Sequence, residues 1–391
     1  MDTTLGIYTH IPFCLKKCPY CDFNSISLHP IPEDIYIDAV LLEFNLLIER
    51  HNLISRQLET IYIGGGTPTL LSPDGVKRLL NGLSAGFSTV EDMEITIEAN
   101  PGTVDLSRLQ GFKAAGVNRL SIGVQSFNDK TLKTLGRIHN ARAGLKAFED
   151  ARGAGFENIG IDLIFGVPGR KGGDWQRDIE MAISLRPEHI SIYNLTIEEG
   201  TPFYTMAQEG RLTFPSDDEE IEMYGTAIHL LKEAGYRQYE ISNFSLPGYE
   251  STHNQRYWLC KDYIGLGAGA HSYLGTDLKS VPSSGVRWWN EKDLFKYMDR
   301  IRRHGDAVTG KEFLTMKEAM VEGVFLGLRR LEGLDKERFL SHFGSPLKDL
   351  YHETIERLKE NNLIFEEGRF IKLTHKGVLL SNEVFAELFS P

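Results

Sequence analysis

The sequence is poor in cysteine, and it lacks both a long apolar run and a surplus of positive charge. Four cysteines in 391 residues cannot build the disulfide framework of a small secreted domain. No apolar run approaches the roughly 18 residues of a membrane-spanning helix. The first residues also lack the basic and apolar regions of a signal peptide. These features predict a cytoplasmic protein with no integral membrane segment.

The charge balance argues against one class of partner. A net charge of −11 excludes the broadly basic surface that sequence-independent nucleic-acid binding needs, so no nucleic-acid partner is expected. A local basic group at residues 300–304 stands near the end of a predicted helix. Positive charge is favourable at such a place whatever the function.

Short apolar segments rich in Ile and Val alternate with amphipathic segments over residues 1–235. Continuous apolar strands are typical of a buried parallel sheet. The predicted strands are 5–9, 60–63, 93–98, 119–124, 158–165 and 189–195, and the predicted helices are 33–51, 73–85, 106–115, 141–154, 174–185 and 217–234. Six βα units predict an α/β fold, an open three-quarter TIM-like (β/α)6 barrel, with a doubly wound sheet as the alternative.

The pattern changes after residue 235. Residues 236–312 read as a connecting α+β segment, rich in glycine and aromatic residues, with a helix at 291–303. Residues 313–391 read as helices, a hairpin at 364–374 and a last helix, which predicts a smaller C-terminal α+β module of winged-helix type. Such modules can bind nucleic acid, but in an acidic chain a packing or capping role is favoured. The predicted domains are therefore 1–235, 236–312 and 313–391.

Three of the four cysteines lie close together in HIPFCLKKCPYCDF, residues 10–23. Cys14, Cys18 and Cys21 have the spacing C-x3-C-x2-C. A zinc site would need a fourth ligand, for which only His10 is near in sequence. An ordinary iron–sulfur cubane uses four thiolates, so three leave one iron open to a small molecule. S-adenosylmethionine (SAM) can chelate that iron through its amino and carboxylate groups, and this combination is a known route to radical chemistry.

Further polar and glycine residues recur near the ends of successive predicted strands. The glycine run GGGTP lets the backbone approach a ligand closely. A carboxylate such as Glu98 can accept both ribose hydroxyls, and Arg137 could pair with the carboxylate of SAM. Each is as well explained alone as a satisfied strand-end group, but together they predict a SAM site. The predicted contacts are Tyr8, Tyr20, Gly65, Gly66, Thr67, Glu98, Gln125, Arg137 and Asp162.

C-x3-C-x2-C directly after a first strand, in a chain of six βα units, resembles the radical-SAM superfamily over roughly residues 1–235. The resemblance implies a [4Fe–4S] cluster on the three cysteines, SAM at the open iron and contact of Tyr8 with SAM. The strings YTHIPFC, GGGTP, EANP, GVQSF and DLIFGVPG look like the oxygen-independent coproporphyrinogen III oxidase family. This likeness covers nearly the whole chain.

That family has two branches, and two features separate them here. One branch decarboxylates coproporphyrinogen III, and the other, of HemW type, binds haem and acts as a haem chaperone. The oxidase branch extends its cysteine motif to C-x3-C-x2-C-x-C, whereas this sequence has Phe23 at the last position. The segment HNQRYW at residues 253–258 matches the H-N-x-x-Y-W motif of the haem-binding branch. Both features favour the haem-binding branch.

The matched motif implies haem contact from His253, Asn254, Tyr257 and Trp258. An imidazole can ligate haem iron, and aromatic rings offer apolar faces to a flat macrocycle. Cys260 and His271 are alternative ligands, although Cys260 is as well explained as an inert buried thiol and the glycines before His271 as a tight corner.

The leading hypothesis is a haem chaperone that binds haem and a SAM-ligated [4Fe–4S] cluster, and that transfers haem to an acceptor haem protein. A low-potential electron donor such as a flavodoxin or ferredoxin is the implied redox partner. The alternative is an enzyme, an oxygen-independent coproporphyrinogen III oxidase. A third possibility is a nucleic-acid-associated protein that uses the C-terminal module. A haem spectrum, a product assay and a salt-dependent binding assay would distinguish the three.

Overall fold

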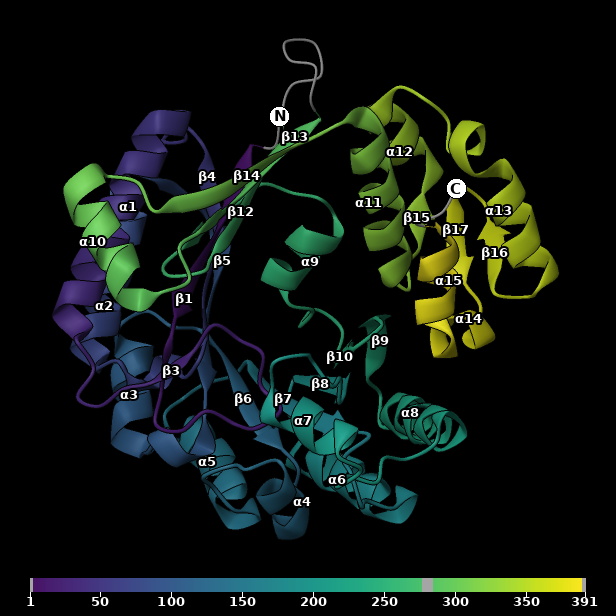
Figure 1. Ribbon diagram of the computed structural model, residues 1–391, viewed down its shortest axis with the longest axis horizontal. Coiled ribbons are helices and arrows are strands. Elements are labelled where there is room, and N and C mark those ends of the chain that lie inside the picture. Colours follow the sequence, from purple (N-terminus) through teal and green to yellow (C-terminus); the bar gives the residue numbers. More distant parts are fainter. Residues whose placement is uncertain (1–2, 276–283, 389–391) are drawn as a thin grey trace.

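The computed structural model describes residues 3–275 and 284–388, and its centre is a strongly curved sheet (Figure 1). Six parallel strands follow one another across the sheet in the order of the chain. A doubly wound sheet would reverse direction at a switch point, so the predicted open α/β barrel is confirmed and the doubly wound alternative is wrong. The strands are β1 (Thr4–Ile11), β4 (Gln57–Gly65), β5 (Ser88–Ala99), β6 (Arg119–Gln125), β7 (Ile159–Phe165) and β8 (His189–Asn194).

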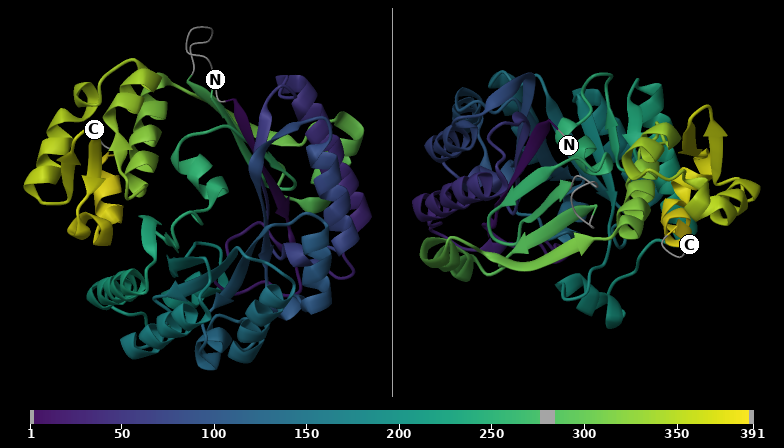
Figure 2. Two further views of the ribbon diagram at one scale, coloured as in Figure 1. Left: turned by 180° about the vertical axis from the view of Figure 1, so that it is seen from behind. Right: turned by 90° about the horizontal axis from the view of Figure 1, so that it is seen from above.

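Helices cover the outer, convex side of this sheet (Figures 1 and 2). The main ones are α1 (Glu33–His51), α2 (Pro73–Ser84), α3 (Leu106–Ala114), α5 (Ala141–Gly153), α6 (Gly172–Leu185) and α8 (Asp217–Glu233). All six agree with the sequence prediction to within two residues. Side chains fix several starts, because Ser72, Asp105 and Asn140 each accept a backbone N–H of the first turn. The short helices α4 (Asp129–Thr134) and α7 (Pro202–Gln208) were not predicted.

The connecting segment extends the same sheet at both edges, which the sequence did not reveal. Strand β11 (Tyr263–Leu266) pairs in parallel with β1. Antiparallel strands continue that edge, and two more extend the other edge beside β8. These are β12 (His271–Gly275), β13 (Gly285–Asn290), β14 (Val308–Leu314), β10 (Asn243–Ser245) and β9 (Arg237–Glu240). The predicted helix is α10 (Leu294–His304), which starts later than expected because Asp293 caps it. Residues 276–283 of this segment lie outside the described residues.

Helix α9 (Thr252–Trp258) lies within the curve of the sheet, on the side opposite the flanking helices (Figure 1). A buried arginine, Arg256, anchors it. Its guanidinium forms an ion pair with Glu59 and donates to the Asp262 carbonyl at 2.6 Å. A Cβ on Gly6 would lie 2.6 Å from Arg256 Nε, so only glycine lets this side chain pass β1.

A carboxylate from the barrel holds the amino end of α9. Glu94 on β5 accepts the backbone N–H of Thr252 at 2.8 Å and that of His253 at 3.2 Å. A carboxylate at this end is favoured by the helix dipole as well as by the free N–H groups. The HNQRYW segment is therefore tied to the barrel interior and does not form a surface loop.

The C-terminal part of the chain forms a small module of helices around a three-stranded sheet (Figure 2). Its elements are α11 (Met316–Arg329), β15 (Leu334–Asp335), α12 (Lys336–Phe343), α13 (Lys348–Glu360), β16 (Ile364–Glu367), β17 (Phe370–Leu373), α14 (His375–Leu379) and α15 (Ser381–Leu388). The predicted hairpin is β16–β17. The division into three domains at residues 235 and 312 stays a prediction. Across the described residues, no helix combines the length and apolarity needed to cross a membrane.

Candidate functional site

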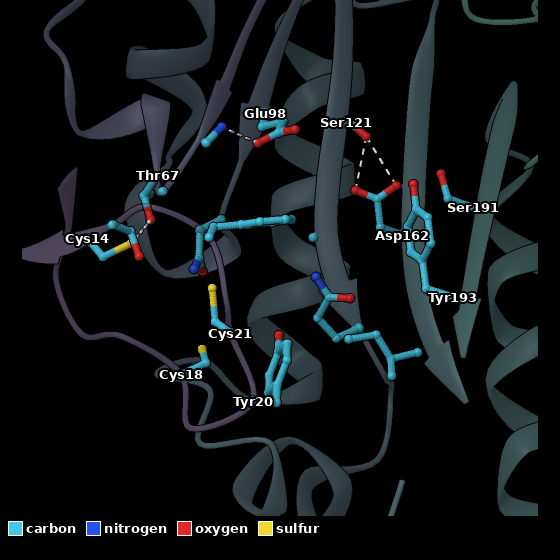
Figure 3. Close-up of a pocket in the computed structure, with 18 of the residues that line it drawn as sticks. Cys14, Cys18, Tyr20, Cys21, Thr67, Glu98, Ser121, Asp162, Ser191 and Tyr193 are labelled. Carbon is cyan, nitrogen blue, oxygen red and sulfur yellow. Dashed lines mark hydrogen bonds between the residues drawn. The ribbon is translucent and has the colours of Figure 1, made fainter. Parts of the chain in front are cut away.

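A cavity of about 430 Å³ opens at the carboxyl ends of the parallel strands. Cys14, Cys18 and Cys21 line one side of it, and none of them forms a disulfide (Figure 3). Cys14 ends the short strand β2 (Phe13–Cys14), which pairs with β3 (Ile26–Ser27). The Cys21 N–H donates to the Cys18 carbonyl at 3.1 Å and closes the turn between these two ligands. The structure thus brings the three predicted thiolates to one cavity.

The glycine run after β4 holds the first cysteine in place. The N–H of Gly66 donates to the Ile11 carbonyl and that of Thr67 to the Phe13 carbonyl, both at 2.8 Å. The Thr67 hydroxyl lies 3.6 Å from Cys14 Sγ. A Cβ on Gly66 would lie 2.7 Å from the Phe13 oxygen, so the close approach requires glycine here. Because these two N–H groups bond the chain on either side of Pro12, the glycine run holds strand β2, and with it Cys14, in position.

Glu98 lies at the end of β5 on the cavity wall. Its carboxylate accepts the Tyr62 hydroxyl at 2.9 Å and the Gly65 N–H at 3.0 Å. Burial is the largest influence on this group, and it raises the pKa of Glu98 to about 7, with the Asp162 carboxylate adding to the rise. The side chain is therefore a fixed acceptor whose ionisation falls near neutral pH.

Gln125, Arg137 and Asp162 line the same cavity from neighbouring elements. Gln125 ends β6 with φ +66°, and its buried Oε1 has no hydrogen-bond partner in the part of the chain that the structure describes. Arg137 donates to the Gly123 carbonyl at 2.8 Å and lies 3.7 Å from Cys18 Sγ, while its buried Nε has no partner among the described residues. Asp162 accepts the Ser121 hydroxyl (Figure 3). Unpartnered polar atoms beside three thiols fit a polar ligand next to a metal cluster.

Of the two tyrosines predicted to contact SAM, Tyr20 lines the cavity and Tyr8 does not. The Tyr20 ring lies 6.2 Å from that of Phe203. Tyr8 lies behind Tyr62, with ring centroids 6.1 Å apart, and its hydroxyl lies 2.9 Å from Nδ1 of His10. Tyr8 therefore supports the cavity wall in this structure.

The HNQRYW motif contacts the same cavity through helix α9, on the inner side of the sheet. His253 is only 1% exposed, and its ring stacks on Tyr62 at 5.1 Å. Both ring nitrogens are engaged, Nδ1 with the Thr60 hydroxyl at 2.7 Å and Nε2 with the Tyr257 hydroxyl at 2.8 Å. Burial, followed by the charge of Arg256, lowers the pKa of His253 to about 3, so the imidazole is neutral.

The other two motif residues that were predicted to contact haem, Asn254 and Trp258, point to different parts of the molecule. Asn254 lines the cavity. Trp258 lies away from the cavity, and the guanidinium of Arg329 on α11 sits 4.4 Å from its ring centroid. The motif therefore joins the cavity to the C-terminal module.

Several cavity residues were missed in the sequence. They sit at alternate positions of β6 and β8, where polar side chains interrupt strands that are otherwise apolar. That alternation was the available signal, because alternate side chains of a strand share one face. The missed residues are Arg119, Ser121, His189, Ser191 and Tyr193.

Two family models match the chain. Residues 8–182 match the radical SAM superfamily, and residues 314–380 match the HemN C-terminal domain. The haem chaperone HemW of Bacillus subtilis is 40% identical over 379 residues, 97% of each chain. The haem chaperone HemW of Escherichia coli is 43% identical over 390 residues, 98% of each chain. The chain belongs to the HemW family.

The fold agrees with this family assignment. The structure of HemN from Escherichia coli, described as a coproporphyrinogen III oxidase and radical SAM enzyme, superimposes with a TM-score of 0.83. It is 25% identical, and the match covers 100% of this chain and 91% of that one. The resemblance predicted from the motifs is thereby confirmed.

The family implies a [4Fe–4S] cluster and SAM. The donor set fits: three free thiols line one cavity, a glycine run closes on the first of them, and unpartnered polar atoms of Gln125 and Arg137 lie beside them. No group of three or more His, Cys, Asp or Glu among the described residues is arranged to hold a single metal ion. A cubane cluster does not require the three thiolates to converge on one metal ion, because each thiolate binds a different iron.

Glu98→Gln is expected to weaken SAM binding by about tenfold or more, because a charge-assisted hydrogen bond contributes about 1.5–3 kcal/mol. Binding to the unmodified protein should also weaken as the pH falls through about 7, where Glu98 takes up a proton. Calorimetry with the cluster-loaded protein across this range would measure both effects.

The matched control for this prediction is Glu198→Gln. Glu198 is an exposed carboxylate that lines the same cavity from the loop after β8. Its loss should leave the affinity and its pH dependence unchanged. Equal affinities for the Glu98→Gln and unmodified proteins would contradict the ribose assignment.

Proposed function

We propose that the protein is a haem chaperone that binds haem and a SAM-ligated [4Fe–4S] cluster and delivers haem to an acceptor haem protein. The observation that carries the proposal is the HNQRYW motif, held by α9 against the wall of the three-cysteine cavity. Full-length relatives that are named haem chaperones support it. Phe23 also stands where the oxidase branch has a further cysteine, and its side chain is 64% exposed at the cavity.

In this proposal, Cys14, Cys18 and Cys21 hold the cluster, and the residues at the strand ends hold SAM. The cluster supplies electron transfer and an open iron for SAM. The SAM contacts are Tyr20, Gly65, Gly66, Thr67, Glu98, Gln125, Arg137 and Asp162, with Tyr8 in support. A low-potential electron donor such as a flavodoxin or ferredoxin would reduce the cluster. The acceptor haem protein would take haem from the motif side.

His253 is the proposed axial ligand, and its neighbours explain how it could serve. Neutral imidazole is the form that binds iron. If the Nδ1 proton is donated to Thr60, the Nε2 lone pair accepts the proton of the Tyr257 hydroxyl. Iron would then replace that hydroxyl proton, and Thr60 would keep the ring oriented, as partners of metal-bound histidines generally do. Haem entry therefore requires α9 to shift and Tyr257 to move.

Haem ligation and SAM binding would share side chains. The His253 ring stacks on Tyr62, whose hydroxyl donates to Glu98, the proposed ribose acceptor. A shift of α9 that exposes His253 removes this support from Tyr62. Because coupling between two binding sites is reciprocal, SAM would in turn change the affinity for haem.

His253→Ala is expected to shift or remove the Soret band of bound haem while the cluster stays intact, because the iron loses its imidazole. The measurement is an absorption titration of the purified, cluster-loaded protein with haem. Tyr257→Phe is the matched variant: it removes only the hydroxyl that occupies Nε2, so haem binding should persist or strengthen.

Two results would count against this proposal in different ways. If the spectrum and the affinity of His253→Ala match those of the unmodified protein, the ligand lies elsewhere, and Cys260 and His271 are tested next. If the unmodified protein takes up no haem at a stoichiometric ratio, the chaperone function itself is wrong.

An oxygen-independent coproporphyrinogen III oxidase is the second candidate function. The specific observation in its favour is the close match of the whole fold to HemN, including the C-terminal module. Phe23 argues against it, and the product assay described in the Discussion decides between the two.

A further inference from the structure

The floor of the cavity, where β6 and β8 begin, holds two buried groups with unused hydrogen-bonding atoms. Arg119 is the first residue of β6 and His189 the first of β8, and both line the cavity. They lie at the opposite ends of these strands from Gln125 and from the cysteines. Neither residue has a part in the cluster or SAM contacts proposed above.

Arg119 is a buried guanidinium that is only 2% exposed. Within residues 3–275 and 284–388, it makes one long hydrogen bond, 3.4 Å, to the hydroxyl of Thr96, and its Nε has no partner. Two carboxylates lie near enough to stabilise its charge, yet both are engaged by other groups: Glu94 by the amino end of α9, and Asp162 by Ser121. Among the residues that the structure describes, none offers Arg119 a carboxylate in direct contact. A buried cation without such a contact is costly to the fold.

His189 presents a second unused donor at the same place. Its Nε2 lies 2.8 Å from the Tyr239 hydroxyl, whereas no described residue bonds its buried Nδ1. The Ser251 N–H donates to the Tyr239 oxygen at 3.3 Å, which leaves the Tyr239 proton free to bond His189 Nε2. Burial and then the Arg119 charge hold the pKa of His189 well below its usual value, so the ring is neutral. In the tautomer in which the Tyr239 hydroxyl donates to Nε2, the single ring proton stands on Nδ1.

A glycine between the two donors leaves room for a ligand atom. Gly160 on β7 pairs with His189, and a Cβ built on it would lie 3.4 Å from His189 Nδ1, 3.5 Å from the Leu120 carbonyl oxygen and 3.7 Å from Arg119 Nη2. Both nitrogens therefore face the same methyl-sized space above this glycine. A polar acceptor placed there could reach both donors at once.

We propose that Arg119 and His189, above Gly160, form a carboxylate-binding subsite at the floor of the cavity. A carboxylate has two acceptor oxygens and a charge opposite to that of the guanidinium, so it satisfies both donors and neutralises Arg119. The carboxylate is either a propionate of haem, in which case the inference rests on the proposed function, or that of a small free acid. Asn254 of the HNQRYW motif lines the same cavity and links the subsite to the motif.

The test uses the full-length, cluster-loaded protein and three probes. It is titrated with haem, with haem dimethyl ester, in which both propionates are masked, and with isotope-labelled propionate observed by NMR line broadening. Arg119→Gln should weaken binding of the carboxylate probe by about tenfold or more, through the loss of a charge-assisted bond. Gly160→Ala should weaken it as well, by filling the space without changing any charge.

Two further measurements separate a binding role from a structural one. Gly225→Ala is the matched control, because a Cβ on Gly225 meets nothing within 4 Å, and it should change no affinity. The midpoint of thermal unfolding of Arg119→Gln measures its structural role separately, because Glu94 and Asp162 lose a nearby positive charge in this variant. A purely structural Arg119 would lower this midpoint and leave the affinities for haem and propionate unchanged.

Each outcome decides the proposal. Weaker haem binding by Arg119→Gln, with dimethyl ester binding unchanged, assigns the subsite to a haem propionate. Labelled propionate that broadens with the unmodified protein and not with the two variants, with haem binding unaffected, assigns it to a small free acid. If neither haem nor propionate distinguishes Arg119→Gln from the unmodified protein, the subsite holds water alone and the proposal is wrong. Failure of the unmodified protein to bind haem refutes the chaperone function and leaves the propionate arm to decide here.

Discussion

Alanine in place of Cys14, Cys18 or Cys21 is expected to abolish the broad cluster absorption after anaerobic reconstitution. The reason is that each thiolate binds a different iron of the cluster, and the chain lines the cavity with no fourth thiol to replace it. Absorption spectra and iron content of the purified variants measure the effect. We expect a loss of most of the bound iron, the largest effect among the substitutions considered.

Cys260→Ala is the control for this series. Cys260 follows α9, lines no part of the cavity, and burial raises the pKa of its thiol to about 12, so it stays protonated. Metal ligation requires the thiolate. Cys260→Ala should therefore keep the full cluster absorption. Loss of the cluster in this variant, with retention in the three others, would refute the three-ligand assignment.

Incubation with coproporphyrinogen III, SAM and reductant is expected to yield no protoporphyrin product. Phe23 occupies the position at which the oxidase branch has a cysteine, and a phenyl ring has no thiol to contribute. A decarboxylase must also hold a flexible tetrapyrrole so that the reacting propionate carbon meets the radical, and small misplacements cost orders of magnitude in rate. Chromatography of the oxidised porphyrins under anaerobic conditions measures the outcome.

Two parallel reactions make this assay decisive. HemN from Escherichia coli, whose fold this chain shares, should form the product under the same conditions. Phe23→Cys in this chain should remain inactive, because restoring one thiol does not shape a substrate cavity. Sustained, SAM-dependent product formation by the unmodified protein would overturn the chaperone proposal in favour of the enzyme.

The barrel was predictable from the sequence because its signals are local. Apolar strands, the amphipathic segments between them and a cysteine motif directly after the first strand each occupy a short stretch of chain. Parallel strands end at one edge of a sheet, so residues such as Cys14 and Glu98 could be expected to meet.

The position of the haem motif was not predictable, because it depends on contacts between distant parts of the chain. Nothing near residue 253 indicates that Glu94 holds the start of α9 or that Arg256 passes Gly6. The sequence suggested a haem contact at His253 without its surroundings, and the structure places His253 in a buried stack with Tyr62. The edge strands β9 to β14 were missed for a related reason, since none of them belongs to a βα unit. All but β11 pair only in antiparallel, and β11, although parallel to β1, is directly followed by the antiparallel β12.

The residues of the cavity floor were not predicted, because the site residues of the barrel were expected near the carboxyl ends of the parallel strands. Arg119 and His189 begin their strands, and a charged or polar residue at such a position is ordinarily read as a solvated boundary. Their burial becomes evident only when the sheet curves and turns both side chains inward.

The pairing of β1 with β11 has a consequence for how the chain folds during synthesis. The partner of β1 on this side, residues 263–266, leaves the ribosome long after β1 itself. Until then, one edge of the first strand has unpaired backbone groups, and the barrel interior lacks α9. An open strand edge is a site of intermolecular pairing. This edge of β1 therefore stays open until about two thirds of the chain has been made, and α9 and β11, which are neighbours in sequence, become available to cover it at nearly the same time.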